Sequence, residues 1–340
     1  MMHLESIANS VTGIKKWGNR YREPLNALML TGAYLVWTVF FRLLTLSFIT
    51  YFLRASTSHF QEISEVYSSN EITLVGLCSL AFLALMLSFG PLSGTYKREV
   101  FTPERIEKKF FPGFIHGAVL ASGVVLAFLL SGRYGYLGFY IRMDEALLAI
   151  TNVIIRVFSL AVMVYSEEYI FRHRILGNLS RFGRSLVSVN DRRKLSPYFT
   201  DLGAIVVTAA LYCLIKAVQF EIGISHLLTL LLVSIAVGLR TLFDQDFARG
   251  AGFWAAILFV FHPLLSLPVL GNEFSGVVLI KFLGTQAELQ GESVTARFLT
   301  GGVGGPISSF AFQLVLLLDI TRNIFLYKKM LLHPRLHQIR

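Results

Sequence analysis

The chain has 340 residues, of which 54% are hydrophobic and only 15% are charged. Soluble domains carry about 25% charged residues, so this composition excludes a soluble globular protein and indicates an integral membrane protein. The formal net charge is +10, but the basic residues cluster beside apolar stretches, which favours contacts with the lipid bilayer over nucleic acid. Both cysteines, Cys78 and Cys213, lie within apolar stretches, so we expect neither a disulfide nor a Cys-based metal site, and no cofactor.

Apolar stretches of about 20 residues, the length that crosses a bilayer, recur about eight times. We expect spans at residues 25–52, 72–91, 113–131, 145–167, 201–219, 226–242, 251–270 and 299–320. The sequence therefore predicts an all-α fold, a polytopic membrane bundle of about eight transmembrane helices. Residues 1–23 place apolar side chains at steps of three and four, which predicts a cytoplasmic amphipathic segment, and residues 24–340 are expected to form a single bundle.

Lys and Arg residues are distributed unevenly between the two sets of loops that these spans define. One set holds 23 of the 31, whereas the opposite set holds five. By the positive-inside rule, both termini are predicted to be cytoplasmic, in the inner or plasma membrane if the protein is bacterial. The remaining three cations, Arg42, Arg156 and Lys216, fall within predicted spans.

Two adjacent carboxylates, Glu167 and Glu168, end the fourth predicted span, and Arg172 follows. An ionised group at bilayer depth costs roughly 2.5–3.5 kcal/mol on insertion scales, so such groups usually mark function. Glu168 and Arg172 are four residues apart in the order that favours an ion pair on a helix. Because successive helical residues point about 100° apart, Glu167 is expected to face a different neighbour.

Glu167 shares a predicted helical face with Asn152, Arg156 and Met163, and Ser159 lies beside this stripe. We expect the stripe to face the bundle interior and to border a polar cavity lined by Glu167 and Arg156. A carboxylate held there can act as a general base near neutrality. A structural ion-pair network is the alternative, and spacing alone does not separate the two.

The segment from Ala161 to Arg172 resembles the first motif, EExxxR, of the CPBP (Abi) family. That family includes CAAX prenyl endopeptidases and bacteriocin-processing proteins, and the resemblance covers residues 145–270. It implies a bundle of about eight membrane helices that acts as a glutamate-dependent intramembrane endopeptidase on membrane-embedded or membrane-anchored peptides. It also implies catalytic roles for Glu167, Glu168 and Arg172.

Two further family motifs, FxxxH and HxxxN/D, supply histidines that assist the first glutamate. The segment corresponding to the second motif runs from Tyr212 to Lys216 and ends in lysine, and the third motif is expected after residues 252–258. His226 and His262 are the nearest histidines to these positions, so they are the candidates for assisting Glu167.

Lys216 leaves the function open between different classes of protein. If Lys216 pairs with Glu167, the protein is a catalytically inactive member of the fold that acts as a membrane binding or protective partner. If a desolvated Lys216 is neutral, it can itself serve as the base. A transporter would also suit charges within the membrane, but the sequence has no inverted repeat.

Three further segments carry weaker expectations. Asp244 and Asp246, with Arg249, are interpreted as a polar cytoplasmic turn because a metal site needs more ligands. Residues 272–297 are expected to form an external segment that is partly apolar. The glycines between 301 and 305 either let the last helix pack closely or break its first turn.

Overall fold

The computed structural model describes residues 2–52, 60–89, 102–139, 146–187, 196–220, 222–270, 276–283, 299, 301 and 305–332. This part of the chain is almost entirely helical. Its elements, in chain order, are α1 (Met2–Phe52), α2 (Phe60–Phe89), α4 (Pro103–Arg105), η2 (Ile106–Phe110), α5 (Phe111–Leu130), β1 (Tyr134–Phe139), α6 (Ala146–Glu168), η3 (Tyr169–Leu176), α7 (Gly177–Val187), α8 (Ser196–Gln219), α9 (Ile224–Asp244), α10 (Ala248–Phe259), η4 (Val260–Leu264), β2 (Val278–Phe282), η6 (Pro306–Ser308) and α13 (Phe310–Leu332). The segments η2, η3 and η4 are π-helical, and η6 is a 3-10 helix.

Seven helices of the described residues are long and apolar enough to cross a membrane, which confirms the prediction of an all-α polytopic bundle. They are Tyr21–Tyr51, Asn70–Ser88, Pro103–Leu130, Ala146–Leu186, Tyr198–Gln219, Ile224–Asp244 and Phe310–Met330. The predicted span 251–270 corresponds instead to a shorter apolar helical stretch, Ala248–Leu264. Its α10 part is almost wholly buried against α5, α6 and α9, so its length is set by neighbouring helices rather than by bilayer thickness.

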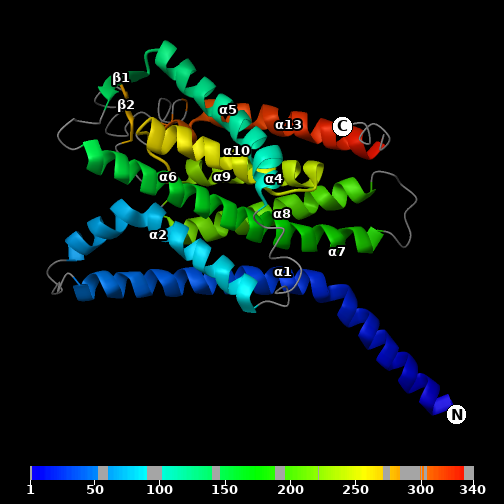
Figure 1. Cartoon of the computed structure of the whole chain (residues 1–340). Coiled ribbons are helices and arrows are strands. Elements are labelled where there is room, and N and C mark those ends of the chain that lie inside the picture. Colours follow the sequence, from blue (N-terminus) through cyan, green and yellow to red (C-terminus); the bar gives the residue numbers. More distant parts are fainter. Residues whose placement is uncertain are drawn as a thin grey trace.

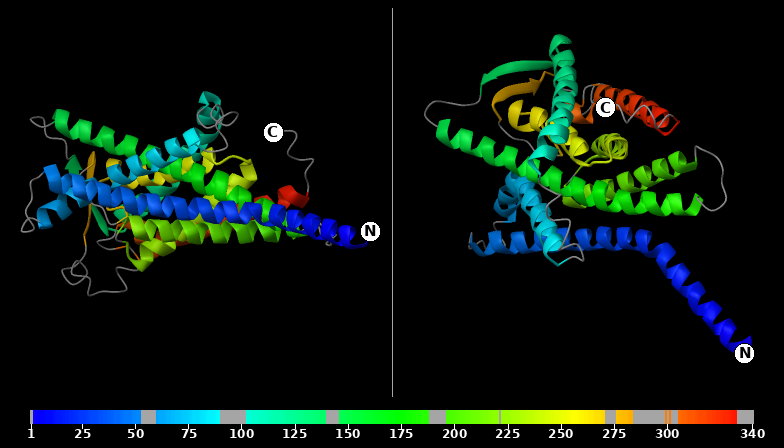
Figure 2. Two further views of the ribbon diagram at one scale, coloured as in Figure 1. Left: turned by 90° about the horizontal axis from the view of Figure 1, so that it is seen from below. Right: turned by 45° about the vertical axis from the view of Figure 1, so that its right-hand side comes forward.

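The helices lie roughly side by side, with α1 along one edge of the bundle and α13 toward the opposite edge (Figure 1). The start of α1 and the end of α13 lie at the same end of the bundle, and the strands β1 and β2 lie at the other end (Figure 2). The N-terminal part of α1 bends away from the bundle (Figure 1), and α1 contains Pro24, which removes a backbone hydrogen bond from a helix. The described ends of the chain, the start of α1 and the end of α13, therefore lie on one side of the bundle, and the cytoplasmic location of the termini stays a prediction.

Helix α5 packs closely against α10 because glycines line the contact. A Cβ atom on Gly117 would lie 2.3 Å from the backbone oxygen of Phe253, and one on Gly252 would lie 2.1 Å from that of Phe110. Small residues let helix backbones approach closely in membranes, where packing rather than the hydrophobic effect drives association. These glycines thus allow α10 to sit at the centre of the bundle.

The fourth helix is longer than predicted. The sequence between the predicted spans 145–167 and 201–219 reads as a polar cytoplasmic loop over about 173–200, and this expectation is wrong at its beginning, because α6, η3 and α7 run continuously to Val187. Helix α7 packs against α1 and α8, and Arg184 pairs with the buried Asp201 at 2.6 Å. Arg172 and Arg240, both counted with the cytoplasmic loops, are likewise buried in helices.

Two more expectations need correction. Part of the segment 272–297 is strand β2, which pairs antiparallel with β1, and residues 284–297 lie outside the described residues. The last span begins at Phe310 rather than at 299. Gly301 and Gly305 have φ of 82° and 77°, a left-handed conformation that glycine adopts readily, so the glycines precede the helix.

The predicted division at residue 23 falls within the continuous helix α1. The side chains that form the expected amphipathic face of residues 1–23 lie largely outside the described residues, so that face stays a prediction.

Candidate functional site

Glu167 lies one residue before the end of α6, where the helix changes to the π-helical segment η3. Its side chain is fully buried in the bundle, which confirms that it faces the protein rather than lipid. π-Helical turns within α-helices are often found at functional sites. The end of α6 around Glu167 is therefore the candidate functional site.

Four side chains donate hydrogen bonds to the Glu167 carboxylate. Lys216 Nζ lies 2.7 Å from Oε1, and the hydroxyls of Tyr34 and Ser79 lie 3.2 and 3.3 Å from the same oxygen. The Tyr212 hydroxyl lies 3.2 Å from Oε2. The donors come from α1, α2 and α8, so one carboxylate joins four helices.

A second layer of hydrogen bonds holds these donors in place. Gln219 Nε2 donates to the Tyr34 hydroxyl at 3.2 Å, and Trp254 Nε1 donates to the Tyr212 hydroxyl at 3.2 Å. The Tyr34 and Ser79 hydroxyls are 2.8 Å apart. The network reaches α10 through Trp254, and its inner members are all buried.

Glu168 and Arg172 form the ion pair that their spacing predicts, with 3.2 Å between Glu168 Oε2 and Arg172 Nε. Arg172 Nη2 also donates to Ser234 Oγ on α9 at 2.7 Å, and the guanidinium carbon lies 5.0 Å from the centre of the Tyr212 ring. Each of the two adjacent carboxylates thus has its own buried cation. This pairing reduces the cost of burying four charges.

Neither candidate histidine hydrogen-bonds Glu167. His226 is half-buried near the start of α9, and His262 is fully buried in η4 with Nδ1 3.4 Å from the Leu267 oxygen. The hydrogen-bond and ion-pair partners of Glu167 in the described part of the chain are the four side chains given above. A catalytic role for either histidine stays a prediction.

The expected polar stripe on α6 is correct in part. Arg156, Ser159 and Met163 are buried like Glu167, whereas Asn152 is exposed. Two pockets between described residues, of about 190 and 10 Å³, are lined by other side chains. Lys216 and the hydroxyl donors lie directly against Glu167, and a polar cavity lined by Glu167 and Arg156 stays a prediction.

Sequence reasoning missed Tyr34, Ser79, Gln219 and Trp254 as members of the site. Each is a single polar group within an apolar helix, and hydroxyls are common in membrane helices, where they bond to carbonyls of their own turn. Ser79 does so with the Val75 oxygen at 2.9 Å. The one feature of the sequence that could have indicated these residues is Glu167 itself, because a buried carboxylate requires hydrogen-bond donors from neighbouring helices.

Two other buried groups of charged and polar side chains link α13 to neighbouring helices. Arg240 on α9 pairs with Asp319 on α13 at 2.6 Å, and its guanidinium carbon lies 3.8 Å from the centre of the Phe253 ring. At the same end as α7, the Tyr327 hydroxyl donates to Asp201 at 2.6 Å. Neither group contacts Glu167, so we interpret both as structural.

The acidic turn after α9 is also held by ion pairs. Asp244 pairs with Arg249 at 2.9 Å and Asp246 with Arg105 at 2.8 Å. Asp246 also accepts from the backbone nitrogen of Ala248 at 2.8 Å, which satisfies the first backbone N–H of α10. Among the described residues, no group of three or more His, Cys, Asp or Glu side chains is placed to hold a metal ion.

The fold and this site define an integral membrane protein of helical-bundle architecture, with paired charges buried where α6 passes into η3. No family model, curated protein or solved structure matches the chain.

Proposed function

We propose that this chain is a non-catalytic integral membrane protein, on a scaffold resembling the CPBP family, that acts by binding a membrane-embedded partner. The observation that carries the proposal is the 2.7 Å contact between Lys216 Nζ and Glu167 Oε1, with both side chains fully buried. Glu167 is the residue that the EExxxR resemblance would make the hydrolytic base.

A general base must hold a water within hydrogen-bond reach and accept its proton. In this site, both oxygens of Glu167 already accept from side chains, three at Oε1 and one at Oε2. Three of these bonds fill Oε1, so a water could reach that oxygen only by displacing a donor, whereas Oε2 accepts one bond and has room for a second. Displacing Lys216 would leave its ammonium group without a carboxylate in the core. The arrangement favours a structural carboxylate over a reactive one.

The sequence around Lys216 supports the same conclusion. Tyr212 stands where the family motif has phenylalanine, and Lys216 stands where it has histidine. Tyrosine adds a hydroxyl that phenylalanine lacks, and lysine replaces an imidazole, which can accept a proton, with an ammonium group that only donates. Both groups donate to Glu167. One such replacement alone would only weaken a catalytic site. Because both replaced side chains bind the same carboxylate, they favour a structural role for Glu167 over a catalytic one.

A glutamate-dependent intramembrane endopeptidase remains the second candidate. One observation favours it: Glu167, Glu168 and Arg172, the three residues of the first motif, are buried together at a π-helical turn. In that case Lys216 would have to move away from Glu167 when a substrate binds.

Cleavage assays separate the two candidates. Purified protein in liposomes is incubated with membrane-tethered peptide reporters, using wild type, Glu167→Gln and Lys216→His, the last of which introduces the histidine of the family motif. We expect no cleavage by the wild type. Cleavage by the wild type that Glu167→Gln abolishes, with unchanged folding, would overturn the proposal.

A complementation assay tests the proposal without a known substrate. In cells lacking the protein, the double variant Glu167→Gln with Lys216→Met, which neutralises the pair, should restore the wild-type phenotype if it accumulates to wild-type abundance. Failure to complement at normal abundance would show that the charged pair is needed for activity and would contradict a purely binding role.

A further inference from the structure

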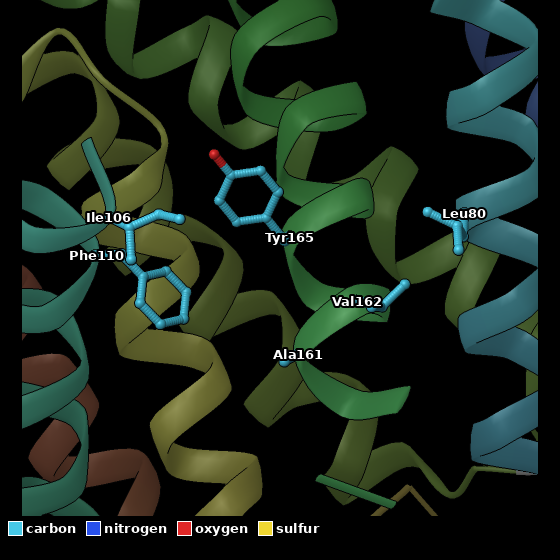
Figure 3. A pocket seen from close by; sticks show the side chains of 6 residues that line it. All are labelled: Leu80, Ile106, Phe110, Ala161, Val162 and Tyr165. Carbon is cyan, nitrogen blue, oxygen red and sulfur yellow. The ribbon is translucent and has the colours of Figure 1, made fainter. Parts of the chain in front are cut away.

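An apolar pocket of about 190 Å³ lies on the outside of the bundle, between α2, η2 and α6. Its lining consists of Leu80, Ile106, Phe110, Ala161, Val162 and Tyr165. Figure 3 shows Val162 pointing toward Leu80, with the rings of Phe110 and Tyr165 on the other side of α6. The pocket is thus built by three separate segments of the chain.

Hydrocarbon suits this pocket better than water does. The Tyr165 hydroxyl is the one polar side-chain group among the six lining residues, and a buried water needs two to four polar partners. Leu80 and Ile106 are each 37% exposed, so the pocket opens to the surroundings of the helices. Since α2, α6 and the helix containing η2 are all candidate spans, those surroundings include lipid chains.

The short helix η2, which supplies two of the lining residues, also carries two lysines. Lys108 and Lys109 stand between the lining residues Ile106 and Phe110 in the sequence. Lys108 is exposed and pairs with Glu104 at 2.8 Å, whereas Lys109 is half-buried and forms no ion pair with the described residues. A lysine without an ion pair among the described residues, on the same short helix as two residues of an apolar pocket, suits a ligand with an anionic head and an apolar tail.

We propose that this pocket binds one acyl chain of an anionic phospholipid, whose phosphate is held by Lys109. The Lys and Arg asymmetry of the loops assigns η2 to the cytoplasmic side, and the cytoplasmic leaflet is the one that carries anionic lipids. The inference does not depend on whether Glu167 is catalytic, because none of the six lining residues is a hydrogen-bond partner of Glu167.

Competition between two lipids in native mass spectrometry tests the site. Purified protein in nonionic detergent is mixed with equal amounts of phosphatidylglycerol and phosphatidylcholine, and the retained lipids are counted. Wild type should retain phosphatidylglycerol preferentially. Ala161→Phe, which fills the pocket from α6, should lose it, whereas Ile154→Phe, at an exposed position on the same helix, should not.

Two further variants address the headgroup and guard against misfolding. Lys109→Gln should weaken phosphatidylglycerol retention about fivefold, the effect of one lysine near a lipid headgroup, and leave phosphatidylcholine unchanged. Lys281→Gln, the same charge change on β2, should have no effect. Leu80→Trp fills the pocket from α2 and should reproduce Ala161→Phe with an unchanged helix content.

The proposal is overturned if both pocket-filling variants, folded by circular dichroism, retain phosphatidylglycerol as Ile154→Phe does. That result would leave a helix of a partner protein as the occupant to consider. Equal retention of the two lipids by the wild type, or equal losses in Lys109→Gln and Lys281→Gln, would likewise overturn the assignment of an anionic phospholipid.

Discussion

Tyr212 and Lys216 lie one helical turn apart on α8 and bind the two different oxygens of Glu167. The Tyr212 hydroxyl is 3.2 Å from Oε2, and Lys216 Nζ is 2.7 Å from Oε1. Residues four apart on a helix point to the same side, so one face of α8 supplies both donors. The carboxylate is thereby fixed in orientation, which suits a group that holds helices together.

Removing the lysine should destabilise the bundle. Lys216→Met leaves Glu167 with hydroxyl donors but no cation, and breaking a buried ion pair by removing one partner costs roughly 3–5 kcal/mol. Thermal unfolding in detergent, followed by circular dichroism, measures the loss. The double variant with Glu167→Gln should recover much of the stability, and a double variant as unstable as Lys216→Met would show that the charge pair is not the cause.

The pair of Arg240 and Asp319 should be equally important for stability. Asp319→Asn leaves the Arg240 guanidinium buried without its carboxylate, so we expect a loss of roughly 3–5 kcal/mol in the free energy of unfolding. Glu104→Gln breaks the exposed pair with Lys108 and serves as the control, with no expected change in melting temperature. Equal behaviour of the two variants would contradict a structural role for the buried pair.

The glycine contact between α5 and α10 provides a matched comparison within one helix. Gly117→Ala would place a Cβ atom 2.3 Å from the Phe253 oxygen, and overpacking of this kind costs about 1–3 kcal/mol. Gly123, on the same helix, has nothing within 4 Å of an added Cβ atom. Gly123→Ala should therefore be neutral or stabilising by up to about 1 kcal/mol, as measured by thermal unfolding.

The orientation in the membrane can be tested by cysteine labelling in intact cells. With Cys78 and Cys213 replaced by alanine, Ser185→Cys on α7 should resist a membrane-impermeant reagent, and Lys281→Cys on β2 should react. The reason is the concentration of Lys and Arg on the α7 side, which the positive-inside rule makes cytoplasmic. Labelling of Ser185→Cys from outside the cell would reverse the predicted topology.

Local patterns in the sequence determined the parts of this protein that depend on neighbours along the chain. Hydropathy over about 20 residues located most of the spans, because burial in lipid is decided by composition. The pair of Glu168 and Arg172 followed from helical spacing, which the tertiary fold does not alter. Lys216 could be named as a partner for Glu167 because a lysine within a span requires a counter-ion.

Only the tertiary structure decided which distant groups meet. Tyr34 and Ser79 reach Glu167 across 133 and 88 residues of sequence, and their pairing depends on how α1, α2 and α6 pack, which no local pattern records. The same is true of α10, whose short length is tolerated because other helices surround it. The strand β2 also formed against a distant partner, β1, since a strand is stabilised by pairing rather than by its own sequence.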